Sequence, residues 1–440
     1  MKNYLFFLFL LTFTSPSFSQ EKIDRKEIAT TIYNFIKNKE YGKALSLMDT
    51  SYTRRVNEER LAVMWNNVLS KGGAFKETKK LVETVQPNFA VVYIPCVFEK
   101  RTTNIKFIFN KNGKVTGINF LPEELREKYQ TPSYYDSLKV TESPYKIFSG
   151  EFTMPGTLSL PKNKTKTPAV ILVHGSGPND RDETVNSTKV FKDIALGLAS
   201  KGIAVLRYDK RSKVFQARAI KKERTVRDET INDVISAYKS LKNIESIDSS
   251  KIFLLGHGFG GMILPRIAKE IPDVAGIFIV AANAGRLEDL ILEQTIFLLS
   301  LDSLTDRKKA LLDTMKTQVN KIKNLTLAQA NDTSLRLVFH AASYWFDLNQ
   351  YNQVSTAGEV DAPVYILHPE RDYQVTMKDY NRWKQGLEHN RNVHFKLYPR
   401  LNHMLQDGTA PSLPDDYKKL GNVPLYFIDD LVGWMTQRKK

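Results

Sequence analysis

The sequence predicts an α/β fold with a doubly wound, mostly parallel sheet, preceded by a small α+β domain. Short apolar runs at residues 169–173, 203–206, 252–255 and 275–280 alternate with segments of helical periodicity. Strands of this composition are buried on both faces, as in a parallel sheet that is flanked by helices. Because 440 residues are too many for one typical domain, we expect two or more domains.

The first part of the chain has a different pattern. Apolar residues recur at helical spacing between residues 24 and 70. From Phe75 the period becomes that of strands, and Asn110-Lys-Asn-Gly113 is a turn between the last two strands. Helices followed by an antiparallel meander predict the α+β domain. The single cysteine, Cys96, excludes an intramolecular disulfide, and its apolar surroundings indicate a buried side chain.

The N-terminus has the pattern of a secretory signal peptide. Lys2 supplies a positive charge, residues 4–13 form an apolar run, and Ser17 and Ser19 are small residues before a cleavage point at Gln20. The run is too short to span a bilayer. We therefore expect an exported protein, periplasmic or secreted, without stable insertion in a membrane.

A long insertion interrupts the strand–helix alternation in the second part of the chain. Residues 286–358 are rich in Leu, Lys, Gln and Asp at helical spacing, and a segment of this size predicts a helical lid. The expected organisation is a signal peptide at 1–19, a small α+β domain at 20–121, a linker at 122–146, and an α/β domain at 147–440 whose lid covers about 285–360.

The chain is basic, with a formal net charge of +16. Residues 207–227 contain nine basic residues and only two acidic ones. The stretch follows a strand whose carboxyl end is expected on the ligand side of an open α/β sheet. The stretch predicts a preference for anionic or polar ligands, and elsewhere the charge indicates a well-solvated surface. We expect no nucleic-acid binding, because no recognition motif is present.

The candidate catalytic centre is Gly256-His257-Gly258-Phe259-Gly260, which stands between an apolar strand and a helix. This is the strand–turn–helix context of a nucleophile elbow, whose pattern is G-x-S-x-G. The nucleophile position is occupied by Gly258 instead of serine. Glycine has no group that can attack a carbonyl carbon, so the elbow lacks its nucleophile.

An oxyanion hole is predicted upstream of the elbow. The strand at 169–173 ends in His174-Gly175-Ser176-Gly177-Pro178. In an acyl-transfer site of this kind, one backbone N–H comes from this loop and another from the residue after the nucleophile. The expected donors are therefore the amides of Ser176 and Phe259. Ser176 is also a candidate for a nucleophile that replaces the missing one.

The acid and the base are expected downstream, in the chain order nucleophile, acid, histidine. Asp372 follows the strand at 364–367, and Glu370 two residues earlier is the alternative acid. His403 follows the strand at 393–397 on a loop before the last helix. A carboxylate in this place would fix the tautomer of the histidine and stabilise its imidazolium.

Together these motifs resemble the α/β-hydrolase superfamily, in particular exported bacterial hydrolases related to serine aminopeptidases, acyl-peptidases and dienelactone-hydrolase-like esterases. The resemblance covers residues 147–440 and is carried by residues 174–184, Arg207-Tyr-Asp-Lys-Arg211, residues 256–261, Glu370-Arg-Asp-Tyr-Gln-Val375 and Leu401-Asn-His403. It implies hydrolysis of esters or amides through an acyl-serine, with a small-molecule or peptide substrate, no cofactor and no metal.

The first domain resembles the small cone-shaped domain of the nuclear-transport-factor-like type that precedes the hydrolase domain in some secreted bacterial hydrolases. The residues that carry this resemblance are Tyr41-Gly42-Lys43-Ala44, Trp65, Gly72, Phe75 and the run at 95–99. They bear no constellation of ionisable groups that suggests chemistry, so we expect a docking or shielding module.

Gly258 leaves two functional hypotheses open. The protein is a hydrolase that is inactive or strongly impaired, with residual activity from water activated by His403. Alternatively, it is a pseudoenzyme that uses the retained pocket to bind an acyl or acidic ligand. The backbone of an elbow is strained for most residues but not for glycine, so the fold is expected to survive either way.

Overall fold

The structure is a computed structural model that describes residues 23–85, 89–122, 129–162, 165–216, 219 and 225–436. It divides into two compact units, Met1–Leu125 and Arg126–Lys440. The predicted signal peptide lies outside the described residues. No helix in the described part of the chain is both long and apolar enough to cross a membrane.

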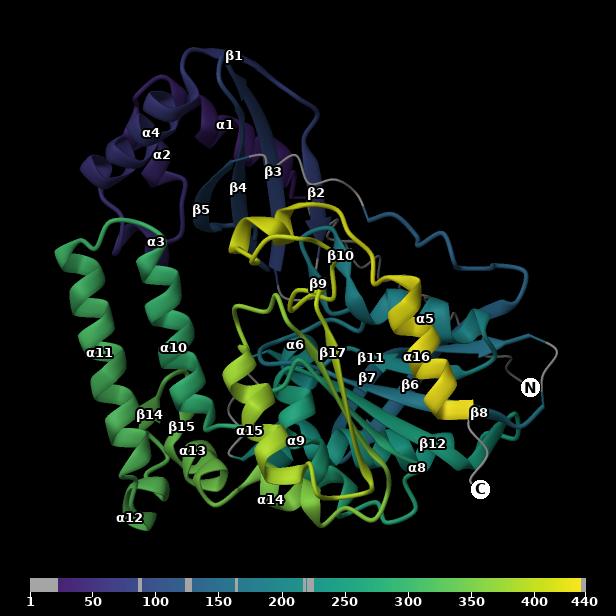
Figure 1. The fold of residues 1–440 in the computed structure, drawn as a ribbon. Helices are drawn as coiled ribbons and strands as arrows, with labels where there is room; N and C mark the ends of the chain where they lie inside the picture. The colour runs from purple at the N-terminus through teal and green to yellow at the C-terminus, as the bar shows by residue number, and fades with distance from the viewer. Residues whose placement is uncertain are drawn as a thin grey trace, which may run out of the picture. The chain divides into compact units, whose positions relative to one another are not determined.

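The first unit packs helices against an antiparallel sheet (Figure 1). Its helices are α1 (Arg25–Lys37), α2 (Tyr41–Ser46), α3 (Thr50–Thr53) and α4 (Glu58–Gly72). Its strands are β1 (Phe75–Thr78), β2 (Val82–Val85), β3 (Phe89–Phe98), β4 (Thr102–Asn110) and β5 (Val115–Pro122). The order is β1-β3-β4-β5, with β2 also paired to β3.

Helix α4 shows how the sequence builds this unit. The Asn57 side chain caps its first turn by accepting a hydrogen bond from the Arg60 amide, and Gly73 ends it with a φ of 78°. Leu61, Trp65 and Val68 lie on one face and are buried in the core of the unit, where Cys96 also lies. The predicted α+β architecture is confirmed.

The second unit is built on an eight-stranded sheet with the order β17-β16-β13-β12-β8-β11-β7-β6. Its strands are β6 (Val140–Ser149), β7 (Phe152–Pro161), β8 (Thr167–Val173), β11 (Ala204–Tyr208), β12 (Ile247–His257), β13 (Ile277–Val280), β16 (Val364–Pro369) and β17 (Val393–Tyr398). The six neighbouring strands β17, β16, β13, β12, β8 and β11 are parallel to one another. Strand β7 pairs antiparallel with β11, and β6 pairs antiparallel with β7 at the edge of the sheet. This is the predicted α/β-hydrolase sheet.

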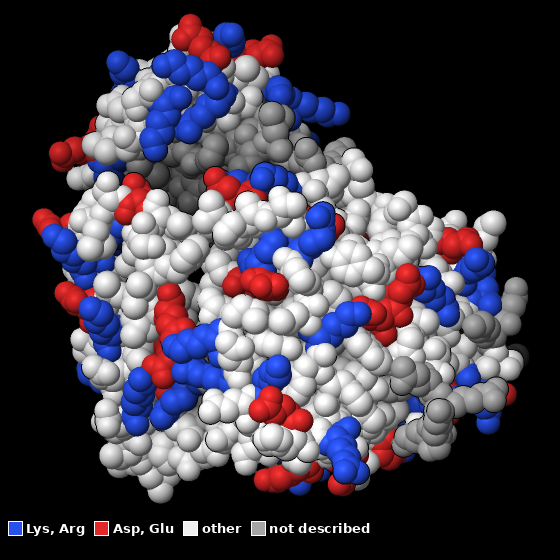
Figure 2. Space-filling view, viewed as in Figure 1, with Lys and Arg blue, Asp and Glu red and all other residues white. Residues whose placement is uncertain are grey.

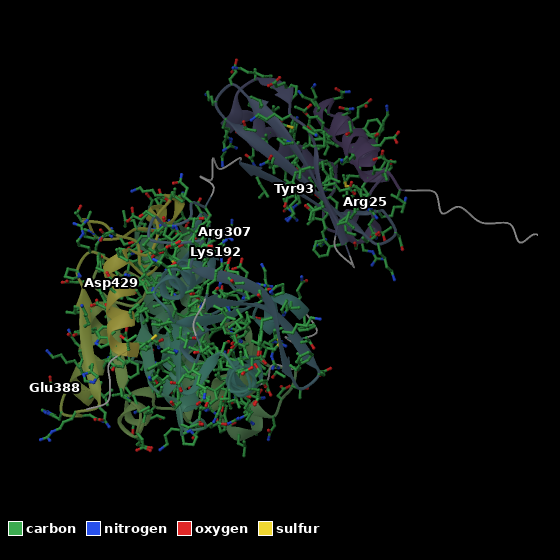
Figure 3. All side chains as sticks on the ribbon, turned by 90° about the vertical axis from the view of Figure 1, so that its right-hand side faces the viewer. Arg25, Tyr93, Lys192, Arg307, Glu388 and Asp429 are labelled. Atoms are coloured by element: carbon green, nitrogen blue, oxygen red, sulfur yellow. The ribbon has the colours of Figure 1, made fainter. Side chains whose placement is uncertain are left out.

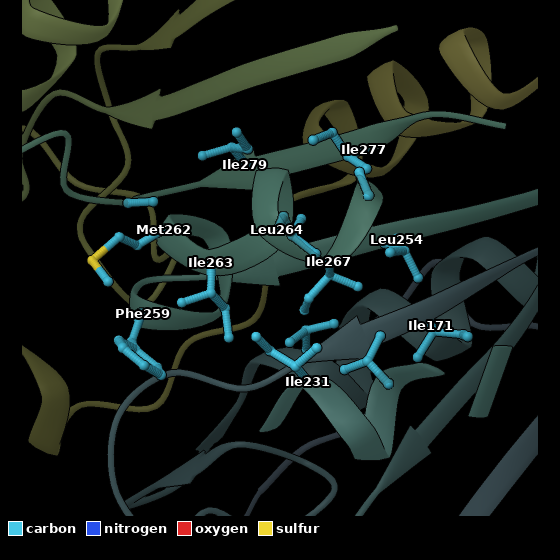
Figure 4. Close-up of a cluster of buried hydrophobic side chains, with 14 of the residues drawn as sticks. Ile171, Ile231, Leu254, Phe259, Met262, Ile263, Leu264, Ile267, Ile277 and Ile279 are labelled. Carbon is cyan, nitrogen blue, oxygen red and sulfur yellow. The ribbon is translucent and has the colours of Figure 1, made fainter. Parts of the chain in front are cut away.

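Helices cover both faces of this sheet. Helices α5 (Val190–Ser200) and α16 (Leu425–Thr436) share one core with alternate residues of the central strands. Helices α8 (Asn232–Leu241), α9 (Phe259–Ala268) and α15 (Met377–Leu387) share the other. Figure 4 shows Ile263, Leu264 and Ile267 of α9 in one buried cluster with Leu254 and Ile277 of the sheet. Each such side chain contributes about 1.5–3 kcal/mol through its burial.

The strand order creates the crevice in which the site lies. From β8 the chain moves outward to β11 and then returns to β12 on the other side of β8. The helices that follow β8 and β12, α5 and α9, consequently lie on opposite faces of the sheet. A ligand site is expected at such a switch point, outside the carboxyl ends of these two strands.

The insertion between β13 and β16 is mainly helical. It contains α10 (Leu287–Ser300), α11 (Asp306–Lys323), α12 (Leu327–Ala330), α13 (Ala342–Asn349) and α14 (Gln353–Gly358). A two-residue hairpin, β14 (Arg336–Leu337) with β15 (His340–Ala341), stands between α12 and α13. Figure 1 shows α10 and α11 side by side as a helical pair.

The structure differs from the sequence expectation at residues 140–146. The sequence assigns them to a linker, but they belong to β6, which pairs along its whole length with β7. Strand β6 lies at the edge of the sheet and exposes most of its middle residues. An edge strand with polar side chains and Pro144 does not have the apolar pattern by which the buried strands are recognised.

Candidate active site

The predicted elbow lies at the carboxyl end of β12. Gly258 stands between the last residue of β12 and the first residue of α9, with φ 54° and ψ −119°. Its amide donates to the Val280 carbonyl at 2.9 Å, and its own carbonyl accepts from the Met262 amide at 3.1 Å. The turn is thus fixed to both the sheet and the helix.

The glycines of the elbow have two different steric roles. A Cβ atom on Gly260 would lie 2.2 Å from the Val173 carbonyl oxygen, so the close approach of helix and strand requires glycine there. A Cβ atom on Gly258 would meet nothing closer than His403 Nε2, at 3.6 Å. Position 258 therefore has room for a side chain that points toward His403.

Asp372 and His403 come together beside the elbow. Asp372 follows β16 and His403 follows β17, and Asp372 Oδ2 lies 2.6 Å from His403 Nδ1. The other carboxylate oxygen of Asp372 accepts from the amides of Gln374 (2.7 Å) and Val375 (3.0 Å). These bonds hold the carboxylate in place, and Nε2 of His403 is left facing the position where a serine hydroxyl would stand.

The two alternative residues lie elsewhere. The Glu370 side chain is exposed, and the structure pairs His403 with Asp372 instead. Ser176 is exposed on the loop after β8, and its hydroxyl makes no hydrogen bond with His403. Geometry therefore favours Asp372 over Glu370 as the partner of the histidine and gives no support to Ser176 as a nucleophile.

The loop after β8 brings the predicted oxyanion donors to the same cavity as His403. Gly175, Ser176, Gly258, Phe259 and His403 all line it. The Gly175 amide already donates to Glu183 Oε1 at 2.8 Å, so it is not the donor for a ligand. The next amide along the loop is that of Ser176, which stays the predicted donor.

The cavity has a volume of about 730 Å³ and mainly apolar walls. The lid contributes Leu287, Leu290, Ile291, Val338 and Phe339, and the loops of the sheet contribute Val185, Val375 and Met404. This volume is within the range of small-molecule sites in proteins, and mainly apolar walls suit an acyl chain.

Two buried ion pairs at the cavity were not predicted from the sequence. His257 Nδ1 lies 3.0 Å from Glu183 Oε2. Lys210 Nζ lies 2.5 Å from Glu229 Oε1, and Tyr344 of the lid donates to the other oxygen of Glu229 at 2.5 Å. Glu183 stands in the run after His174 that carries the family resemblance, but nothing in the sequence shows which cation it meets.

The basic stretch at 207–227 is not a free positive surface. Arg207 binds Asp182 and Glu142, and Arg211 binds Asp233. Lys210 is paired with Glu229, as described above, and Arg227 is paired with Glu270. Arg218, Lys221, Lys222 and Arg224 lie outside the described residues. The described part of the stretch thus gives no support for an anionic ligand, because carboxylates of the same unit neutralise four of its cations.

Comparisons with known proteins give family matches for both units. The profile of the family described as "Serine aminopeptidase, S33" matches residues 165–408. A second profile, "Protein of unknown function (DUF3887)", matches residues 29–118. Esterase EstD of Thermotoga maritima is 30% identical over 430 residues, which are 98% of each chain.

The solved structures that match the chain include the following two. The acylaminoacyl peptidase of Pyrococcus horikoshii has a TM-score of 0.45 at 12% identity, over 83% of this chain and 57% of that one. Est1E of Butyrivibrio proteoclasticus has a TM-score of 0.42 at 13% identity, over 66% of this chain and 98% of that one.

Proposed function

Because the chain belongs to the serine aminopeptidase S33 family of α/β-hydrolases, we propose that it binds carboxylic esters in its lidded cavity and hydrolyses them only slowly. The observation that carries this proposal is Gly258 at the elbow beside a complete Asp372–His403 pair. In this proposal Asp372 and His403 are acid and base, and the amides of Ser176 and Phe259 are the oxyanion hole. The alternative is a pseudoenzyme that only binds its ligand.

The residual reaction would proceed without an acyl-enzyme. A water molecule next to Gly258 attacks the ester carbonyl carbon and gives its proton to His403 Nε2. The amides of Ser176 and Phe259 stabilise the negative oxygen of the tetrahedral intermediate. His403 then returns the proton to the leaving alkoxide as the carbon–oxygen bond breaks. Asp372 stabilises the imidazolium between these two steps.

An ester is a better fit than a peptide with a free amino end. An aminopeptidase needs an unpaired acceptor for the substrate ammonium group. The carboxylates that line the described cavity are Glu183 and Glu229, and each is already paired with a cation of the protein. Apolar walls and the relative named as an esterase both support an ester with an apolar acyl group.

Turnover of p-nitrophenyl butyrate tests the proposal. Loss of a triad serine costs about a million-fold in a measured protease, so Gly258→Ser is expected to raise the rate at least about a thousandfold. The serine hydroxyl fits, because the Cβ position is 3.6 Å from His403 Nε2. His403→Ala in the Gly258→Ser chain is expected to abolish the gain.

The unmodified chain separates the two alternatives. If His403→Ala lowers its slow turnover, His403 activates water, whereas an unchanged background rate together with ligand binding indicates a pseudoenzyme. Fast turnover by the unmodified chain, or no gain from Gly258→Ser in a folded protein, contradicts the proposal.

We also propose that the protein is exported. The support is the charged start, short apolar run and small residues at Ser17 and Ser19. Expression of the full chain in a bacterial host should yield a mature protein that begins at Gln20, measured by mass spectrometry of the periplasmic or secreted fraction. An intact N-terminus in the cytoplasmic fraction would contradict export.

A further inference from the structure

His257 lies directly under the proposed catalytic centre, yet the reaction described above does not use it. It is the residue before Gly258 and is only 3% exposed. Its ring lies against that of His403, with 4.6 Å between the ring centroids. It is also the ion-pair partner of Glu183, which is 5% exposed. A buried ionisable pair in this place requires an explanation, because burying charges is costly unless they are paired.

The surroundings of His257 determine its protonation. Nε2 lies 2.8 Å from the backbone carbonyl oxygen of His403, which can only accept a hydrogen bond. Nδ1 lies 3.0 Å from Glu183 Oε2. The other oxygen of Glu183 accepts from the Gly175 amide. The carbonyl takes the one N–H of a neutral imidazole at Nε2, and a bare Nδ1 would then face an ionised carboxylate oxygen at 3.0 Å. An ion pair at this distance therefore requires a proton on both ring nitrogens.

We propose that Glu183 holds His257 as a permanent imidazolium, and that this ion pair is a positioning device that fixes the base and the oxyanion loop to the elbow. Glu183 binds the loop after β8 through Gly175. His257 binds the loop after β17 through the His403 carbonyl and itself ends β12. Three loops that come from separate strands are thereby joined at one buried pair.

The direction of both pKa shifts agrees with this geometry. Burial is the largest single influence and lowers the pKa of His257, but the charge and hydrogen bond of Glu183 together with the His403 carbonyl outweigh it, so the pKa is raised. Burial is also the largest single influence on Glu183 and raises its pKa, but the charge and hydrogen bond of His257 together with His174 and the Gly175 amide outweigh it, so that pKa is lowered. The other ionisable groups that face the pair are His403, whose ring lies against that of His257, Asp372, which acts on His257, and His174, which acts on Glu183.

The pair deepens the proposed function, on which its catalytic consequence rests. A positively charged ring beside His403 opposes the charge that His403 gains when it takes a proton, while Asp372 favours that charge. The pair also fixes the position of the His403 backbone. A shift of about 1 Å in a reacting group can cost about a hundredfold in rate, so this anchoring is expected to affect kcat more than ligand binding.

The protonation is measured on the unmodified chain by nitrogen-15 NMR of the histidine side chains. The signals of His257 are assigned by their loss in His257→Gln. The expected result is a His257 ring with two N–H groups that does not titrate between about pH 6 and 8. In Glu183→Gln the same ring should lose one proton. An unprotonated ring nitrogen on His257 in the unmodified chain near neutral pH would overturn the proposal.

The positioning role is measured in the Gly258→Ser chain. Adding Glu183→Gln is expected to lower kcat about tenfold or more while KM stays within about twofold. The matched control is Asp233→Asn, which neutralises a buried carboxylate paired with Arg211 and absent from the cavity lining. This control is expected to change stability with kcat unaltered. An unaltered kcat in folded Gly258→Ser/Glu183→Gln would overturn the positioning role.

The two proposals fail separately. If His257 is doubly protonated but the Gly258→Ser variant does not turn over esters, the ion-pair proposal stands and the proposed function is refuted. If Gly258→Ser turns over esters but His257 is neutral, the proposed function stands and the ion-pair proposal is refuted.

Discussion

At the scale of single residues, the elbow separates glycines that the packing requires from one that it does not. Gly256, Gly260 and Gly261 each lie so close to neighbouring atoms that a Cβ would meet one within 2.8 Å. A Cβ on Gly258 would be in ordinary van der Waals contact with His403, at 3.6 Å, and only the positive φ disfavours a side chain there. That backbone conformation costs a non-glycine residue about 1–3 kcal/mol, which a folded domain can tolerate. Packing therefore does not require glycine at position 258. Its departure from the family pattern changes the chemistry of the site more than the packing.

Two glycine-to-alanine substitutions test this distinction between crowded and open positions. A methyl group on Gly260 would lie 2.2 Å from the Val173 carbonyl oxygen, so Gly260→Ala is expected to destabilise the second unit by about 3 kcal/mol or more. Gly433 lies inside α16 with no atom within 4 Å of its Cβ position, so Gly433→Ala is expected to stabilise by about 0.5–1 kcal/mol.

Urea unfolding followed by circular dichroism gives both free energies. The two variants carry the same chemical change, and only their surroundings differ. Effects of the same sign and size would show that the elbow can relax around a methyl group, against the packing described for β8 and α9.

At the scale of elements, the sequence was most informative where strands are buried on both faces. The apolar run at 169–173 lies in β8, which pairs with β11 and β12 in the middle of the sheet. Residues 140–146 of edge strand β6 were assigned to a linker because exposure allows this strand polar side chains. The loops that carry Asp372 and His403 were predictable, since chain order fixes which strand ends meet at the crevice.

Pairs of charges were the part that the sequence could not predict. Glu183 and His257 are far apart in the chain and meet only because β8 and β12 are neighbours in the sheet. The same holds for Lys210 and Glu229, and for Arg207 with its two carboxylates. A run of cations in a sequence gives a local net charge, but it does not show that carboxylates from other elements neutralise that charge within the fold.

At the scale of the whole molecule, the chain has a formal net charge of +16, and many of its charged side chains form ion pairs. On the face shown in Figure 2, acidic and basic side chains lie next to one another over the second unit. Figure 3 shows the Glu388 and Asp429 side chains at the surface of this unit, and Asp429 lies 2.7 Å from Lys201. Pairs this exposed contribute little to stability, about 0–1 kcal/mol each. The pH dependence of stability is therefore expected to come from buried groups.

Two buried histidines make the second unit sensitive to acid. Burial lowers the pKa of His174 to about 4 and that of His368 to about 4. In the unfolded chain a histidine takes its proton near pH 6.5. As the pH falls from 7 to 5, the unfolded chain gains these protons and the folded chain does not, so folding becomes less favourable. Each group is expected to cost roughly 2 kcal/mol over this interval.

Substitution of His174 by phenylalanine tests this expectation. His174 packs against Phe191 and Tyr208 at centroid distances of 5.3 and 5.0 Å, and neither ring nitrogen has a hydrogen-bond partner among the described residues. A phenyl ring therefore fits without loss of a polar contact. The free energy of unfolding decreases in both chains as the pH falls from 7 to 5. The decrease should be smaller in His174→Phe than in the unmodified chain, by roughly 2 kcal/mol.

The control is His389→Phe, whose side chain is 93% exposed and which should leave the pH dependence unchanged. Urea unfolding at both pH values measures the difference. An equal fall in His174→Phe and in the unmodified chain would mean that His174 is not held neutral. In that case the acid sensitivity would have to come from carboxylates whose ion pairs are lost on protonation, since their stabilisation also decreases as the pH falls.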